Sequence, residues 1–388
     1  MDGVLVDSEP VHMKAFEVLI KSLGKKFDKN YYYQFIGSTT DHMWDKVIED
    51  NKLSFDKSQL MEMSDRFVAQ ILGDAGYPVM SGAADLIKRL KTDNIKLAIA
   101  SSSGIDRIDN TLKKMGVFDE FDARVSGIDV KNPKPAPDTF LAAAEKLNVD
   151  PSECLVIEDS LNGIKAAKNA GMVCVMFEND NGMPHLDSSL ADYVITGYED
   201  LDLGFFEMVY SHQKNQPWTV DVTDRLIIRE LGNKDFLIIY KILDDGESSE
   251  FISASDIEIF MNNDKFQAYI HNVYKFYGYG MYGLFLKNGK MIGMAWFNNT
   301  DYGIELGYII DRKYRRNGYA YEACKRLLEF ARDYYLSDEM ICTIKADNTS
   351  SQRLCRKLEF IQSENFGSTN PEILVFKKEL WCANTVPF

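Results

Sequence analysis

Met1-Asp2-Gly3-Val4-Leu5-Val6-Asp7-Ser8-Glu9 is the stretch that most constrains the fold of this 388-residue chain. It sets an aspartate and a glycine before a short apolar run. A long segment with helix-like spacing of apolar residues, such as Phe16, Leu19 and Leu23, follows it. Residues 11 to about 80 keep this spacing without strand-like alternation. We therefore expect a helical insert directly after the opening stretch.

Short apolar runs replace the helical spacing from Lys96 onward. They cover residues 97–100, 154–157, 173–177 and 193–195, and helix-like segments separate them. Apolar strands that alternate with helices are typical of a parallel sheet with both faces covered. The helix after Asp159 is expected to end at Asn169-Ala170-Gly171, because glycine favours the left-handed conformation that stops a helix. The first part of the chain is therefore predicted to be an α/β domain.

The sequence changes character at residues 211–220. This polar segment, Ser-His-Gln-Lys-Asn-Gln-Pro-Trp-Thr-Val, has no periodicity and contains Pro217, which is typical of a linker. Beyond it, strands are expected at residues 226–228, 283–286, 291–297 and 304–310, and a long helix at 319–335. Because domains average about 150 residues, we predict two of them, residues 1–210 and 221–388, the second also mixed α/β.

The composition fits a globular protein, with 45% hydrophobic and 27% charged residues. The sequence has no run of about eighteen apolar residues and no basic start followed by an apolar stretch. We therefore expect neither a membrane span nor a signal peptide, and predict a cytoplasmic protein. The six cysteines lie far apart without metal-ligand spacing, so we expect reduced, mostly buried thiols.

The charge of the chain is acidic, with a net value of -15. Up to Pro217 it has 23 basic and 35 acidic residues, and after Pro217 it has 21 and 24, so the first part carries most of the excess. Nucleic acid and anionic membranes require a basic face. We therefore expect neither as a partner, and the acidity is consistent with a surface that keeps the protein dissolved.

Polar residues follow the predicted strands of the first part. Ser101 closes the run at 97–100, Glu158 and Asp159 close the run at 154–157, and Lys134 lies between prolines in Asn132-Pro133-Lys134-Pro135. The carboxyl ends of parallel strands are where open α/β sheets bind ligands. Each feature alone also fits a turn, a surface loop or a helix N-cap. Their order and spacing together favour a phosphate-handling site.

These segments resemble the haloacid dehalogenase-like phosphohydrolases, whose first motif is a strand ending in Asp-x-Asp-Gly. The resemblance implies a Rossmann-like core with a helical cap of the β-phosphoglucomutase-like subgroup. It also implies that Ser101 and Lys134 hold the phosphoryl group of a small phosphate ester. A Mg²⁺ site would involve Asp2, Glu158 and Asp159, with Asp159 as the direct ligand. His12, in the entry to the cap, either meets substrate or is an exposed helix residue.

The same motif raises a question about the attacking group. In the family the first Asp attacks phosphorus and the second protonates the leaving group; here Asp2 takes the second position and Met1 the x position. The resemblance therefore implies that the nucleophile and its strand lie upstream of Met1. Either the start codon is assigned too late, or this half is inactive and serves as a phosphate-binding module.

A second candidate site lies in Arg315-Arg316-Asn317-Gly318-Tyr319-Ala320. This loop joins the predicted strand at 304–310 to the helix at 319–335. A glycine-containing loop before a helix N-terminus presents unpaired N–H groups, so it can hold a pyrophosphate. The apolar face of the helix, which includes Ala323, Leu327 and Phe330, is expected to pack on the sheet and to fix the loop.

Residues 221 to about 365 resemble the GNAT superfamily of N-acetyltransferases. The match rests on Arg315, Gly318 and Ala320, on Thr223-Asp224-Arg225-Leu226, and on Asn348-x-x-Ser351; Glu359-Phe360 departs from the usual Gly-Phe. The resemblance implies acetyl-CoA as cofactor and an amine acceptor, either a small molecule or a protein N-terminus. It assigns cofactor binding to Arg315, Arg316, Asn317, Gly318, Tyr319, Ala320 and Asn348.

Acetyl transfer needs a base for the amine and a proton donor for the departing thiolate. Glu305, on the strand beside the loop, is the candidate base, and an outward-facing strand carboxylate is the alternative. Cys355 occupies the position where several family members have a donor tyrosine, but it also fits a buried packing residue. Tyr308 and Ser351 are further candidate donors. The remaining alternative is that this half binds CoA without transferring acetyl.

Overall fold

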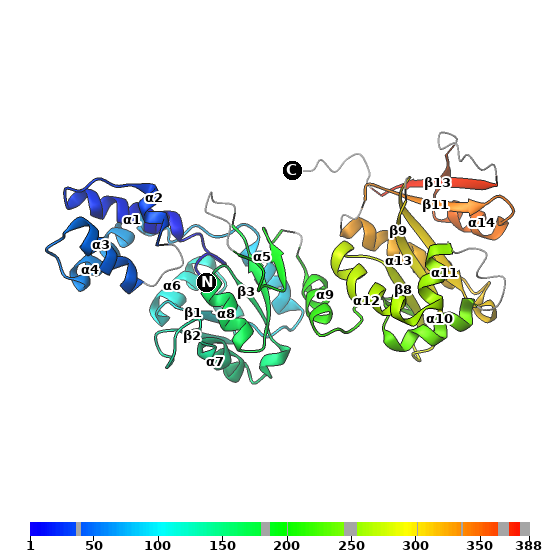
Figure 1. Ribbon diagram of the computed structural model, residues 1–388, viewed down its shortest axis with the longest axis horizontal. Coiled ribbons are helices and arrows are strands. Elements are labelled where there is room, and N and C mark those ends of the chain that lie inside the picture. The colour runs from blue at the N-terminus through cyan, green and yellow to red at the C-terminus, as the bar shows by residue number, and fades with distance from the viewer. Residues whose placement is uncertain are drawn as a thin grey trace. The chain divides into compact units, whose positions relative to one another are not determined.

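The computed structural model describes residues 1–35, 40–179, 187–199, 201–243, 254–300, 302–334, 337–363 and 372–380. The chain divides into two compact units, Met1–Gln213 and Lys214–Phe388 (Figure 1). The division falls within the segment 211–220 that the sequence suggests as a linker. None of the helices in the described ranges is both long enough and apolar enough to cross a membrane.

The predicted helical insert of the first unit is confirmed. Its helices are α1 Glu9–Ser22, α2 Lys29–Tyr33, α3 Thr40–Asn51 and α4 Lys57–Leu72. They form their own small core, in which Phe16, Leu19, Trp44 and Leu60 are buried. Helix α4 begins where it does because the Asp56 side chain accepts the N–H of Gln59 and completes a capping box.

The rest of the first unit is a parallel α/β core. Its strands are β1 Ala98–Ser101, β2 Ala123–Ser126, β3 Leu155–Glu158, β4 Val173–Phe177 and β5 Tyr193–Ile195. Its helices are α5 Ala83–Thr92, α6 Ile105–Met115, α7 Asp138–Leu147, α8 Leu161–Asn169 and α9 Leu203–Gln213. All five residues of β4 are buried, as expected for a strand covered on both faces. The predicted stop after α8 is confirmed, with Gly171 at φ 76°.

The parallel strands fall into two groups. Strand β1 pairs with β2, and β4 pairs with β3 on one side and β5 on the other. Both β1 and β3 line a cavity of about 530 Å³, which helices α5, α7 and α9 also line with apolar side chains such as Leu86, Ala143 and Phe206. The expectation that a further strand belongs to this sheet stays a prediction.

The second unit is built on one eight-stranded sheet in the order β12-β13-β11-β10-β9-β8-β7-β6. The strands are β6 Thr219–Val222, β7 Leu226–Glu230, β8 Met281–Leu286, β9 Met291–Thr300, β10 Gly303–Ile310, β11 Glu339–Lys345, β12 Ile361–Gln362 and β13 Ile373–Glu379. The helices are α10 Phe236–Leu243, α11 Ala254–Met261, α12 Asn263–Tyr277, α13 Tyr319–Asp333 and α14 Thr349–Lys357.

The sheet opens between two of its central strands, β10 and β11. Strands β9 and β10 pair antiparallel along the whole of β10. Strands β10 and β11 instead run parallel and pair only at Glu305 and Ile341. Residues of both strands beyond that pair line a cavity of about 730 Å³. The two strands therefore part at their carboxyl ends, and helix α13, which connects them, begins near the opening.

Candidate active sites

In the first unit, Lys134 connects the ends of the two strand groups. Its Nζ donates to the Ala100 carbonyl of β1 at 3.2 Å and to Oε1 of Glu158, at the end of β3, at 2.5 Å. The side chains of Lys134 and Glu158 are 9% and 8% exposed, so this is a buried ion pair. The structure thus brings together three of the segments that the sequence suggests for phosphate binding.

Glu158 is held in place by the start of helix α8. Its Oε2 accepts the backbone N–H groups of Asp159 and Ser160 at 2.8 and 2.9 Å and the Ser160 hydroxyl at 3.0 Å. Gly163 leaves room for it, because a Cβ there would lie 2.0 Å from Oε1 of Glu158. Burial, the largest single effect, would raise the pKa of Glu158, but the charge and hydrogen bond of Lys134, together with the Ser160 N–H and other nearby positive charge, lower that pKa.

Asp159 lies directly against the opening stretch of the chain. A Cβ on Gly3, which has φ +66°, would come within 1.7 Å of Oδ2 of Asp159, so this close approach requires glycine. Burial and the neighbouring Glu158 carboxylate both raise the pKa of Asp159. Both effects favour the protonated form of Asp159. A bound cation would instead stabilise its charged form.

The predicted Mg²⁺ ligands fit a metal unequally. Asp159 fits, because it is a carboxylate beside another carboxylate with no Lys or Arg side chain paired to it in the described part of the chain. Glu158 is occupied by Lys134 and is suited to support Asp159. No group of three His, Cys, Asp or Glu side chains among the described residues is arranged to hold an ion. The metal role of Asp2 stays a prediction.

Asp2 instead belongs to a cluster that the sequence analysis missed. Its Oδ1 accepts from Arg107 at 2.6 Å and its Oδ2 accepts from the Ser103 hydroxyl at 2.9 Å. Arg107 also lies 3.1 Å from Nε2 of His12 and over the ring of Tyr77. Arg107 occupies the first turn of α6, which starts just after β1, so its position at the strand ends could have been inferred from the predicted topology.

The charges in this cluster are strongly coupled. Burial, the largest single effect, would raise the pKa of Asp2, but the Arg107 guanidinium, the Ser103 hydrogen bond and other nearby positive charge together hold that pKa below its ordinary value. Burial, with the Arg107 charge adding to it, lowers the pKa of His12 to about 4. His12 is therefore a neutral, partly buried group beside Asp2. The alternative that it is an ordinary exposed helix residue is wrong.

Ser101 takes its predicted place at the end of β1. The residue is buried, and its hydroxyl accepts the backbone N–H of Ser103 at 3.2 Å. Its carbonyl accepts the N–H of Gly127 at 2.6 Å, which ties the end of β1 to the end of β2. The hydroxyl hydrogen is thereby left to point away from the Ser103 amide, as a phosphoryl-binding donor requires.

In the second unit, the loop 315–320 leads into helix α13 as predicted. Arg316 and Gly318 have φ values of 65° and 83°, and Gly318 is the N-cap of the helix that begins at Tyr319. Arg315 Nε donates to the Ile310 carbonyl at 2.9 Å, and the Asn317 amide donates to the carbonyls of Tyr314 and Arg315. The loop is thus fixed by its own side chains next to the opened strands.

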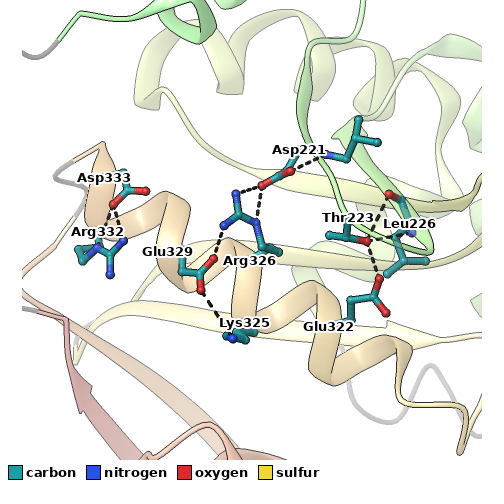
Figure 2. A network of polar contacts seen from close by, with 10 residues as sticks. Asp221, Thr223, Leu226, Glu322, Lys325, Arg326, Glu329, Arg332 and Asp333 are labelled. Carbon is teal, nitrogen blue, oxygen red and sulfur yellow. Dashed lines mark hydrogen bonds and ion pairs between the residues drawn. The ribbon is translucent and has the colours of Figure 1, made fainter.

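The strand hairpin at the start of this unit braces the same loop. Arg225 Nη1 donates to the Asn317 carbonyl at 2.9 Å, its Nε donates to Glu322 at 2.6 Å, and its guanidinium lies over the Tyr319 ring. Figure 2 shows the neighbouring contacts, in which Thr223 also donates to Glu322. The quoted Thr-Asp-Arg-Leu stretch therefore holds the first turns of α13, a role that its sequence did not reveal.

Further along α13, a second set of ion pairs fastens the same hairpin. Arg326 pairs with Asp221 of β6 and with Glu329 one turn on (Figure 2). The contacts come from side chains on one face of the helix. The adjacent face carries Ala323, Leu327 and Phe330, which are buried. The predicted packing of this helix on the sheet is confirmed.

The large cavity of the second unit contains the predicted transfer residues. Glu305 lines it and accepts from both the backbone N–H of Thr343, at 3.0 Å, and the Thr343 hydroxyl. Tyr308 lines it as well, with its hydroxyl 3.0 Å from that of Ser351. Burial raises the pKa of Tyr308, so its hydroxyl keeps its proton. Glu305 thus faces the cavity, and its role as base stays a prediction.

Asn348 and Cys355 also line the cavity. Asn348 is the N-cap of α14 and accepts the N–H of Ser351 at 3.1 Å. Cys355 is 3% exposed, and Cys342 lines the same cavity. The hydrogen bond between the two thiols, and then burial, raise the pKa of Cys342. The surroundings of Cys355 therefore fit the interpretation of a buried packing residue.

Unit by unit, these features define the class of protein. The first unit joins a helical insert to a parallel sheet with a buried lysine and carboxylates at its strand ends. These features are typical of phosphohydrolases with a parallel α/β core. The second opens a mixed sheet beside a glycine-capped helix, as in acyltransferases.

Comparison with known proteins gives the families. Residues 1–171 match the family described as haloacid dehalogenase-like hydrolase, and residues 225–361 match the acetyltransferase (GNAT) domain. The fructose-1-phosphate phosphatase of Escherichia coli is 33% identical over 175 residues, which cover 45% of this chain and 92% of that protein. The β-phosphoglucomutase of Bacillus subtilis is 30% identical over 209 residues, which cover 52% and 89%.

A solved structure is similar to this chain as well. The β-phosphoglucomutase of Clostridium difficile is 26% identical, with a TM-score of 0.47, and the alignment covers 55% of this chain and 96% of that one. On the two family matches and the Escherichia coli relative, the chain belongs to the haloacid dehalogenase-like hydrolases through its first unit and carries a GNAT acetyltransferase domain in its second. Both family predictions are confirmed.

Proposed function

We propose that the second unit transfers an acetyl group from acetyl-CoA to an amine. The observation that carries this proposal is that β10 leads through the loop 315–320 into a glycine-capped helix, while Glu305 and Tyr308 of the same strand line the cavity between β10 and β11. A helix N-terminus of this kind holds the pyrophosphate of a nucleotide cofactor. Arg315 and Arg316 add positive charge there, and Asn348 borders the same cavity.

The proposed reaction starts from an ammonium group near Glu305. Glu305 takes one proton, directly or through a water, and the amine nitrogen attacks the thioester carbonyl. The C–N bond forms and the C–S bond breaks. Tyr308, which stays protonated and is hydrogen-bonded to Ser351, gives its proton to the departing thiolate and regains one, directly or through a water, from the nitrogen of the new amide.

Release of free thiol with a panel of amines tests this activity. Acetyl-CoA should be consumed only when an amine is present, and CoA should bind to the protein in calorimetry even without one. CoA binding without any amine-dependent thiol release would support the alternative of a CoA-binding module. Absence of CoA binding would overturn the proposal altogether.

For the first unit we propose a site for a small phosphate ester. The buried Lys134–Glu158 pair supports this proposal, because the same ammonium also contacts the Ala100 carbonyl, one residue before the Ser101 hydroxyl, at the end of β1. Mg²⁺ held by Asp159 would neutralise charge on the phosphoryl oxygens. Asp2, once released from Arg107 by substrate, would exchange a proton with the leaving oxygen. Glu158 and Asp2 are both engaged in ion pairs, so neither is assigned the attack on phosphorus.

Two proteins tested side by side separate turnover from binding. One is this chain, and the other carries an added apolar strand ending in Asp before Met1. Mg²⁺-dependent hydrolysis of p-nitrophenyl phosphate by the extended protein alone would support an attacking carboxylate from such a strand. Equal activity of both would contradict it, and phosphate binding without hydrolysis by either would favour the binding module.

A further inference from the structure

The lining of the cavity in the second unit has two parts, which the sheet order puts on either side of β10. Asn348, Ser351 and Cys355 follow β11, and there the proposed acetyl group would enter. Four aromatic residues, Tyr269, Tyr277, Tyr279 and Trp296, which we call the aromatic wall, belong to α12, β9 and the segment before β8. Glu305 lies on β10, between β9 and β11.

Two of the three tyrosine hydroxyls of the aromatic wall are hydrogen-bonded within the protein. The Tyr279 hydroxyl donates to Asn299 at 2.9 Å, and the Tyr269 hydroxyl accepts the backbone N–H of Met281 at 2.9 Å. Ile259 and Val273 add aliphatic side chains to the lining, and Asn298 and Asn299 add amides. A ligand beside the wall would therefore meet aromatic rings and aliphatic side chains together with a few uncharged polar groups.

Gly307 lies directly against one member of the aromatic wall, Trp296. It is the β10 partner of Trp296 on β9, and a Cβ on Gly307 would lie 2.2 to 2.4 Å from atoms of the Trp296 indole. The indole therefore occupies the space that a side chain of β10 would need. Any residue other than glycine at this position would clash with the ring and displace it.

Charge is scarce on the described part of the lining. Glu305 and Lys345 are the charged side chains there, and Glu305 is already bonded to Thr343. A ligand with several positive charges would need several carboxylates to replace its hydration. The described lining thus has one carboxylate and one lysine. This small number of charges suits an acceptor with a single ammonium group attached to an uncharged body.

We propose that the acceptor is a primary amine borne on an aromatic or bulky apolar group, and not a polycationic amine. The ammonium group binds near Glu305 while its body packs on the aromatic wall. This inference rests on the proposed acetyl transfer and narrows its substrate class. Two sources share this chemistry, a free arylalkylamine and a peptide whose first residue is aromatic.

A competition between acceptors tests the inference. The full chain is assayed for thiol release with acetyl-CoA and four acceptors: 2-phenylethylamine, the peptide amide Phe-Gly-Gly, the peptide amide Ser-Gly-Gly, and spermidine. We expect kcat/KM for an aromatic acceptor to exceed that for spermidine by about 10- to 100-fold, as apolar pockets usually discriminate. Preference for Phe-Gly-Gly over 2-phenylethylamine assigns the peptide source, and the reverse assigns the small amine.

Substitutions in the wall provide the second arm. Tyr277 is 47% exposed, so Tyr277→Ala should leave the fold intact, and Tyr277→Phe is its matched control. Tyr277→Ala should lower kcat/KM for the aromatic acceptors about 10-fold and that for Ser-Gly-Gly much less, whereas Tyr277→Phe, which keeps the ring, should retain most of it. Gly307→Ala should lower kcat/KM for the aromatic acceptors more than that for Ser-Gly-Gly as well, because it displaces the Trp296 ring from its place in the wall.

The outcomes separate this inference from the proposed function. Absence of CoA binding, or of thiol release with every amine, would remove the proposed function itself. Acetylation in which spermidine or Ser-Gly-Gly matches the aromatic acceptors would keep the acetyltransferase and overturn the acceptor class. An equal fall in kcat/KM for all acceptors in Tyr277→Ala would also overturn the acceptor class, since that pattern reports a structural effect.

Discussion

The two units place positive charge in different ways for the phosphate groups that we propose they bind. In the first, a side chain supplies it: Lys134 is buried and its position depends on the Glu158 carboxylate. In the second, the backbone at Gly318 and Tyr319 contributes it, and a side chain, Arg225, holds that backbone in place. A single substitution can therefore remove the ammonium group of Lys134 in the first unit. In the second unit, a substitution of Arg225 can only make the backbone N–H groups less well ordered.

The largest effect is expected from breaking the buried pair of the first unit. Lys134→Met leaves Glu158 charged and unpaired in a buried place, which should cost about 3–5 kcal/mol of the free energy of unfolding of that unit. Urea unfolding followed by tryptophan fluorescence and circular dichroism measures the cost. Lys134→Met combined with Glu158→Gln should recover most of it.

Lys91→Met is the matched control in the same unit. Its ammonium pairs with Asp122 at 2.6 Å, and the two side chains are 31% and 38% exposed, so the loss should stay below about 1 kcal/mol. Equal losses for Lys134→Met and Lys91→Met would contradict the claim that burial of the pair makes the difference.

The next largest effect concerns the proposed base of the second unit. Glu305→Gln keeps an oxygen that can accept from Thr343 but cannot take up a proton. We expect kcat for acetylation to fall about 100-fold, the lower range for loss of a general base, with CoA affinity unchanged. Steady-state kinetics and calorimetry of CoA check this. Unchanged kcat would show that Glu305 is a structural strand carboxylate.

A smaller effect is expected when the brace on the backbone is removed. Arg225→Ala loses the bonds to Asn317 and Glu322 and the contact with the Tyr319 ring, so the loop 315–320 should be less well ordered for CoA. We expect the KM for acetyl-CoA to rise about 10-fold, or about 1.4 kcal/mol, with little change in kcat. Arg326→Ala, one turn further along α13, is the control and should change KM less. A fall in kcat alone would argue against a positioning role.

The smallest effect is a pH dependence confined to the first unit. His12 has a pKa of about 4 in the folded protein and an ordinary value of 6.5 when unfolded, so below pH 6.5 the unfolded chain binds more protons. Stability is therefore full above pH 6.5 and falls as the pH drops toward 4, by on the order of 1 kcal/mol between pH 6.5 and 5. His12→Gln should flatten this slope in urea unfolding, and His12→Gln with an unchanged slope would place the titration elsewhere.

Sequence reasoning reached the elements with strong patterns. Strands β4 and β5 have the predicted limits, and β1, β3 and the strands β7 to β10 were placed within a few residues, because their apolar runs are unambiguous. Strand β2, Ala-Arg-Val-Ser, was not predicted, since four residues with a central arginine carry little signal. Strands β11 to β13 and helices α10 to α12 were also not singled out, because their pairing and packing depend on distant residues.

The sites were predicted as far as motifs reach. Ser101, Lys134, Glu158 and the loop 315–320 lie where their strand-end and loop contexts indicate. Arg107 was missed because an arginine in the first turn of a helix is ordinary until the fold brings Asp2 and His12 beside it. The aromatic wall was missed for the same reason, since its members come from α12, β9 and the segment between α12 and β8.

The position of Trp296 makes its fluorescence sensitive to what the cavity contains. The ring lies against Gly307 and lines the cavity of the second unit, so any compound that fills the cavity changes the polarity around it. Its emission should shift to shorter wavelength as water leaves. Of the other tryptophans in the described residues, Trp44 belongs to the first unit and Trp218 is outside this lining. The protein therefore carries a built-in fluorophore with which acceptor occupancy can be followed without any label.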